Sequence, residues 1–70
     1  SLEDQVSQID NFIDVYDTEL IRLEELLKKD FSESKYLFGW LEHDAERVSA
    51  RLKWLQRFRE SLTETVTNNV

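Results

Sequence analysis

Apolar side chains recur along the first part of the chain with an alternating spacing of four and three residues. The run consists of Leu2, Val6, Ile9, Ile13, Tyr16, Leu20, Leu23 and Leu27. This spacing places every one of these side chains on one stripe of an α-helix, as in the heptad repeat of a coiled coil. A helix with such a stripe needs a second helix to cover it, so the pattern predicts a helix packed against a partner helix.

The first helix is expected over about residues 2–29. Ser1, followed by Asp4 three residues later, is typical of an N-cap with acidic residues in the first helical turn. Lys28 and Lys29 suit the negative C-terminal end of the helix dipole. The helix is therefore predicted to end just before residue 30.

Poor helix formers gather at about residues 30–34, where we expect the turn. Ser32 is the predicted N-cap of the second helix, because Phe31 and Tyr36 could close a hydrophobic staple around it. The second helix is then expected over about residues 33–67, which leaves residues 68–70 as a tail.

The predicted second helix carries a wider apolar stripe than the first. Its central line is Leu41, Val48, Leu55 and Leu62; one flank adds Phe38, Ala45, Leu52 and Val66, and the other adds Leu37, Trp40, Trp54 and Phe58. A stripe of this width serves two neighbouring helices, and a single hairpin would leave one flank exposed to water. We therefore expect an all-α, coiled-coil-like antiparallel helical hairpin that dimerises into a four-helix bundle.

One long coiled coil is the alternative layout, because the heptad of the first helix continues through the predicted turn without a slip. The continued repeat places Leu41, Val48, Leu55 and Leu62 in the seam, but it also places polar residues there: Asp30, Ser34, Asp44, Arg51 and Thr65. Polar residues at so many seam positions disfavour a continuous coiled coil. The hairpin is the preferred layout.

The distribution of charge also favours a hairpin. Residues 1–30 hold nine acidic and three basic residues, whereas residues 31–70 hold six of each. Folding the chain back at residues 30–34 brings bases of the second helix near acids of the first, with these expected neighbours: Arg47 with Asp17, Arg51 with Asp14, and Arg57 or Arg59 with Glu3 and Asp10. Exposed ion pairs contribute little stability, but they select the antiparallel arrangement.

Composition narrows the class of protein. The chain of 70 residues is 40% hydrophobic and 34% charged and contains no cysteine, and no apolar run approaches the roughly 18 residues of a membrane span. We expect a soluble protein without a membrane partner, intracellular and cytoplasmic, with the nucleus left open; its start at Ser1 favours a fragment of a longer protein. Domains under about 70 to 80 residues without disulfides or metals often need oligomerisation, which supports the dimer.

Candidate chemistry is sparse. The single histidine, His43, lies three residues before Glu46, but a helical di-metal site requires further histidines and inward-facing carboxylates, and we expect His43 to face solvent. No base is placed to activate a serine, threonine or tyrosine, and no glycine-rich phosphate loop is present. The sequence predicts neither an enzyme nor a bound metal or cofactor.

The predicted function is a non-catalytic protein–protein interaction or oligomerisation module that pairs with itself. Five of the six residues at 36–41 are large and apolar, so this segment could also dock a helix of another protein as an adaptor. The predicted interface residues are Ile9, Phe12, Ile13, Tyr16, Leu20, Leu23, Leu27, Leu37, Phe38, Trp40, Leu41, Trp54 and Phe58.

A nucleic-acid-binding regulator is the alternative function. Arg47, Arg51, Lys53 and Arg57 form a basic stretch that is interleaved with Trp54 and Phe58, and arginine and aromatic side chains together can grip phosphates and stack on bases. A net charge of −6 opposes this function, because it repels a polyanion unless the basic face is well separated.

Overall fold

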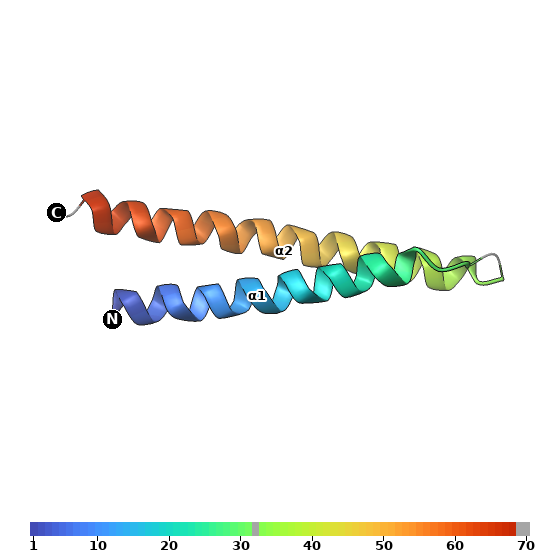
Figure 1. Ribbon diagram of the computed structural model, residues 1–70. Helices are drawn as coiled ribbons and strands as arrows, with labels where there is room; N and C mark the ends of the chain where they lie inside the picture. The colour runs from blue at the N-terminus through green and yellow to red at the C-terminus, as the bar shows by residue number, and fades with distance from the viewer. Residues whose placement is uncertain (32, 69–70) are drawn as a thin grey trace.

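The chain folds into two antiparallel helices joined by a short turn. The computed structural model describes the backbone of residues 1–31 and 33–68, and side chains up to residue 64 apart from residue 32. Helix α1 spans Leu2–Leu27 and helix α2 spans Lys35–Asn68. The helices lie side by side, with the turn at one end and both termini at the other (Figure 1), in a rod 58 Å long and 14 Å across in Cα positions. The predicted helical hairpin is confirmed.

Backbone and side-chain caps define both ends of α1. The Ser1 hydroxyl accepts a hydrogen bond from the Asp4 backbone N–H at 3.2 Å, which confirms the predicted N-cap. At the other end the helix stops at Leu27, two residues before the predicted end, and Lys28 is the C-cap. The backbone N–H groups of Lys28 and Lys29 donate to the carbonyls three residues earlier, which is how a tightened last turn satisfies helix-end carbonyls.

Helix α2 starts two residues later than predicted. Ser34 directly precedes it, and its carbonyl accepts the Phe38 N–H at 3.2 Å; the predicted cap at residue 32 lies outside the described residues. Because the helix starts two residues later, Phe31 packs on the ring of Phe38, at 5.7 Å between centroids, and not on the predicted partner Tyr36. Tyr36 is 94% exposed. At the far end α2 includes Asn68, which had been assigned to the tail, while the rest of that tail lies outside the described residues.

The hydrophobic core lies between the two helices. Its buried cluster consists of Leu23 from α1 and Leu41 and Val48 from α2, with further buried side chains at Ile9 and Leu52. All eight apolar seam residues of α1 are buried or half-buried. Burial of this seam is the main favourable term that holds the hairpin together.

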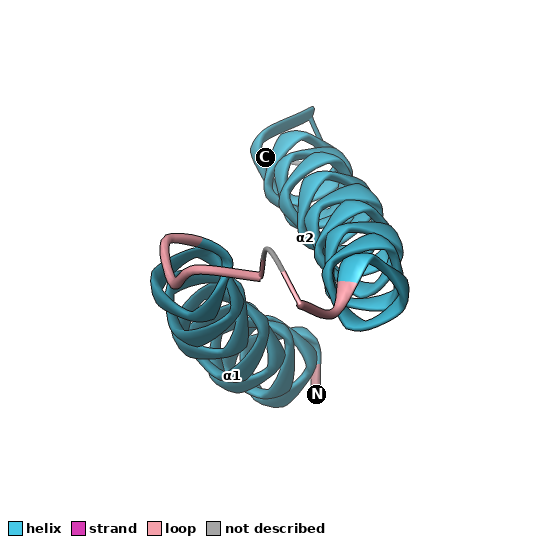
Figure 2. Ribbon diagram, turned by 90° about the vertical axis from the view of Figure 1, so that its right-hand side faces the viewer, coloured by secondary structure: helices cyan, strands magenta, loops and turns pink. Residues whose placement is uncertain are grey.

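Helix α1 covers only part of the apolar stripe of α2. Together with the central line it covers the half-buried Ala45 and the buried Leu52 of one flank. Phe38 of that flank is 37% exposed, and Val66 has its side chain outside the described part. The other flank, Leu37, Trp40, Trp54 and Phe58, stays exposed. Figure 2, which looks along the rod, shows α1 and α2 as each other's neighbour. The bundle expected from the sequence would require a second copy.

One ion pair joins the two helices away from the core cluster. The guanidinium of Arg59 donates from Nε and Nη2 to the two carboxylate oxygens of Asp10, and both side chains are half-buried. The hydrogen bond that Arg59 donates to Asp10, and the negative charge of that carboxylate, raise the pKa of Arg59. Among the described residues this is the one pair formed of those expected from the charge distribution, and it agrees with the antiparallel register.

Removing the most deeply buried side chain should destabilise the hairpin. Leu23 is 1% exposed, so Leu23→Ala is expected to lower the free energy of unfolding by about 2–5 kcal/mol, as for a typical core leucine. Ile21 is the control: its side chain is 56% exposed on the same helix, and Ile21→Ala should change stability by less than about 0.5 kcal/mol. Urea unfolding followed by circular dichroism at one protein concentration measures both, and equal losses would contradict this placement of the core.

Gly39 offers a stabilising substitution. It lies in the interior of α2, and a Cβ added to it would meet no atom within 4 Å. Gly39→Ala should therefore raise the free energy of unfolding by about 0.5–1 kcal/mol, because alanine loses less backbone entropy in a helix. The reverse change at the exposed Ala50 of the same helix, Ala50→Gly, should cost about as much. Destabilisation by Gly39→Ala in thermal or urea unfolding would show that the position is crowded.

Candidate interaction surface

A line of side chains, all of them exposed except the half-buried Asp44, follows α2 beside the core. It consists of Leu37, Trp40, Asp44, Arg47, Arg51, Trp54 and Phe58, spaced alternately by three and four residues, and we call it the aromatic face. Trp40 is 64% exposed and Trp54 is 59% exposed. Large apolar side chains gathered on one helix face in this way are typical of a surface that meets a partner.

Two rings of this face are already ordered against each other. Trp54 and Phe58 lie one helical turn apart and stack with centroids 5.1 Å apart and planes inclined by 7°. Trp54 is 59% exposed and Phe58 is 41% exposed, so both rings remain accessible to a partner. A stacked pair of this kind presents a flat apolar surface whose rotamers are already restricted, so a partner meets a smaller entropic cost on binding.

Helix α1 extends the same surface. Tyr16, Arg51, Trp54 and Leu55 line a shallow hollow of about 230 Å³ between the two helices. Phe12 lies one turn before Tyr16 and is 55% exposed, and Val15 beside it is 62% exposed. The apolar surface therefore spans both helices at this level of the hairpin.

Charged side chains occupy the middle of the surface. On α1, the Arg22 guanidinium donates to Glu19, from Nε at 3.0 Å and also from Nη2. This hydrogen bond lowers the pKa of the Glu19 carboxyl below its ordinary value of 4.5. The same hydrogen bond is the largest effect raising the pKa of Arg22, and the charge of Asp44 on α2 raises it further. Glu19, Arg22 and Asp44 thus interact electrostatically. We call these three residues and Arg47 the charged centre.

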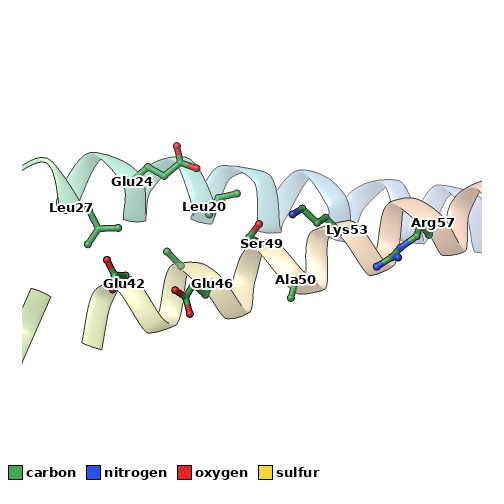
Figure 3. Close-up of a pocket in the computed structure, with 10 residues that line it drawn as sticks. Leu20, Glu24, Leu27, Glu42, Glu46, Ser49, Ala50, Lys53 and Arg57 are labelled. Carbon is green, nitrogen blue, oxygen red and sulfur yellow. The ribbon is translucent and has the colours of Figure 1, made fainter. Parts of the chain in front are cut away.

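A groove lies on another side of the hairpin. It has a volume of about 520 Å³ and is lined by Leu20, Glu24, Leu27, Glu42, Ala45, Glu46, Ser49, Ala50, Lys53 and Arg57. Figure 3 shows the glutamates toward one end, Lys53 and Arg57 toward the other, and Ser49 and Ala50 between them. Leu20, Leu27 and two alanines line it beside the charged side chains, but none of its described lining residues is aromatic.

The four basic residues of the alternative function do not share one face. Lys53 and Arg57 line the groove, together with three glutamates. Arg51 lies in the hollow beside Trp54, and Arg47 is one turn away from it on the same side of α2. A polyanion would have to contact two sides of the helix to reach all four bases.

His43 is exposed, and histidine, aspartate and glutamate side chains nowhere in the described part of the chain form a group of three that could hold a metal ion. Neither helix, in its described residues, has a stretch apolar and long enough to cross a membrane.

The predicted interface residues fall into two groups. Those buried or half-buried inside the hairpin are Ile9, Ile13, Tyr16, Leu20, Leu23, Leu27 and Leu41; those exposed are Phe12, Leu37, Phe38, Trp40, Trp54 and Phe58. Sequence reasoning missed Val15, although its spacing of three from Phe12 places both on one side of α1. The exposed large hydrophobic side chains are therefore the second group together with Val15, Ile21 and Tyr36.

Comparisons with known proteins identified no relative of this chain. No family model matches the chain, and no curated protein or solved structure matches it. Function is therefore inferred from the burial pattern and charges of the hairpin itself.

Proposed function

We propose that this chain is a non-catalytic protein–protein interaction module that associates with itself through the aromatic face. The proposal rests on a comparison of the hydrophobic side chains that the hairpin buries with those that it leaves exposed. Among the described residues, five hydrophobic side chains are buried and nine large ones remain exposed. A second copy is the partner that the sequence itself supplies at equal concentration, and closed dimers are the commonest form of self-association.

Energetics support pairing of hairpins. A two-helix hairpin buries a small core, and below about 80 residues such a core rarely offsets the conformational entropy of folding. Anything that binds the folded state and not the unfolded state adds to stability by mass action. Pairing of hairpins through their exposed aromatic side chains supplies this term, and it produces the four-helix bundle expected from the width of the stripe.

A helix of another protein is the second occupant to consider. Tyr36 and Trp40 lie beside the turn and are among the most exposed large side chains, so the end of the hairpin could serve as an additional contact. Phe38 and Leu41 are less available to such a partner, because Phe38 packs on Phe31 and Leu41 is buried in the core.

Removing an aromatic side chain should weaken self-association while leaving the hairpin folded. The expected mass from light scattering in a micromolar concentration series is that of a dimer, and Trp54→Ala should raise the dissociation constant at least about tenfold, as for an interface hot spot. Ile21→Ala is the matched control, since Ile21 is 56% exposed and Trp54 is 59% exposed, but Ile21 lies on the side of α1 away from the aromatic face.

Circular dichroism at the same concentrations should show that helix content is retained in both variants. A folded monomer at every concentration tested would refute self-association. Equal weakening by Ile21→Ala would show that the contact lies elsewhere on the hairpin.

A further inference from the structure

We propose that the second copy lies with its α2 antiparallel to α2 of the first, about a two-fold axis that crosses the helices near Arg47. This inference rests on the proposed self-association and assigns its geometry. The occupant of the aromatic face is a second copy of this chain, oriented so that the turn of one hairpin points the same way as the termini of the other. The evidence is the symmetry of the aromatic face itself.

The pattern of apolar residues in the aromatic face is nearly symmetric about Arg47. Trp40 and Trp54 lie seven residues on either side of Arg47, and Leu37 and Phe58 lie ten and eleven residues from it. An antiparallel copy centred near Arg47 therefore places an apolar end against an apolar end. Such self-complementarity is what a two-fold interface requires, because the same patch serves both partners.

The charges of the centre agree with this orientation. In the antiparallel pair, Asp44 of each copy faces Arg51 of the other, so opposite charges meet twice. The two Arg47 side chains lie near the axis and near each other, with an Asp44 on either side of them. In a parallel pair the same residues would face their own copies, acid against acid and base against base. Like charges at close range oppose that pairing, so the parallel arrangement is disfavoured.

Helix α1 carries a matching pattern at the same level. Phe12 and Leu26 lie seven residues on either side of Glu19, and Glu19 and Arg22 belong to the charged centre. The other acidic residues of α1 lie on its remaining sides, so the strongly acidic half of the chain does not oppose this contact. The two patterns are centred on Arg47 in α2 and on Glu19 in α1. These centres lie at one level of the hairpin, so a single two-fold axis can pass there.

Pairing of α2 with α1 of the second copy fits less well. If α2 packed against α1 of the second copy with Asp44 level with Arg22, Leu37 would be level with Lys29, and Phe58 level with Gln8. In that arrangement the two outer apolar residues of the aromatic face would lie against polar side chains. Antiparallel α2 helices cover all four apolar positions with apolar partners.

The size of the surface is sufficient for a dimer. The aromatic face from Leu37 to Phe58 is about 30 Å long, and two adjacent helices are about 20 Å wide, which gives roughly 600 Å² of flat area. Side chains that interdigitate bury more than the flat area, and a stable interface buries about 800 Å² per partner. The face is therefore of the order that a specific dimer needs.

Single cysteines test the orientation, because the natural chain contains none. Arg47→Cys places a thiol near the proposed axis, where it lies close to the same thiol of the second copy. Ser61→Cys continues the same face, but its two thiols would be about 40 Å apart along the helices. A short bis-maleimide reagent should therefore link Arg47→Cys into covalent dimers and leave Ser61→Cys mainly unlinked.

The outcomes separate this inference from the proposed function, provided that light scattering first measures the mass of each variant. A dimer that links at both positions would show parallel helices, and a dimer that links at neither would show that the α2 helices are not neighbours; both results overturn the geometry and leave self-association intact. A folded wild-type monomer at every concentration would overturn both.

A mixed sample of two other cysteine variants tests the same geometry in case Arg47→Cys itself weakens dimerisation. Asp44→Cys and Arg51→Cys face each other across the proposed interface, so mixing them should give severalfold more covalent dimer than either variant alone. Equal yields in the mixed and single samples, at concentrations where both variants are dimeric, would also contradict the antiparallel geometry.

Discussion

The width of the apolar stripe on α2 is the constraint on which the rest of the structure depends. A hairpin gives α2 one neighbour, and one neighbour covers the central line and a single flank. The interior that results is small, with Leu23 as its most deeply buried side chain. Because folding stability is a small difference between large opposing terms, the uncovered flank matters both for the fold and for function.

Side-chain size explains which flank turns toward α1. Packed helices lie about 8–10 Å apart, a separation set by the side chains between them. Ala45 and Leu52 fit that space beside Leu41 and Val48, whereas an indole ring at the same place would force the helices apart. Farther along, the long side chain of Arg59 reaches Asp10 and keeps its charge near solvent. The bulky residues are therefore left on the outside.

The hairpin, the seam of α1 and the Ser1 cap could be predicted from the sequence because each follows from spacing or from one local hydrogen bond. Periodicity alone does not choose the exposed flank, since both flanks are apolar, although all four residues of the flank with the tryptophans are among the predicted interface residues. The start of α2 was also beyond local signals: serines at residues 32 and 34 are equally good caps by type. The packing of Phe31 on Phe38 agrees with the later of the two starts. The packing of Phe31 on Phe38 thus distinguishes two starts of α2 that local helix-capping preferences do not distinguish.

The charged centre and the apolar ends of the aromatic face contribute to different properties of a pairing surface. Burying apolar side chains contributes most of the free energy of association, while charged groups lose hydration when covered and regain much less through pairing. Charges at the centre therefore add little affinity, but they penalise every arrangement in which they meet like charges. The hydrogen bonds between Glu19 and Arg22 already restrict two of these side chains before any partner arrives. A face with apolar ends and a charged middle is consequently selective for orientation at a modest cost in strength, which suits a module whose own core is small.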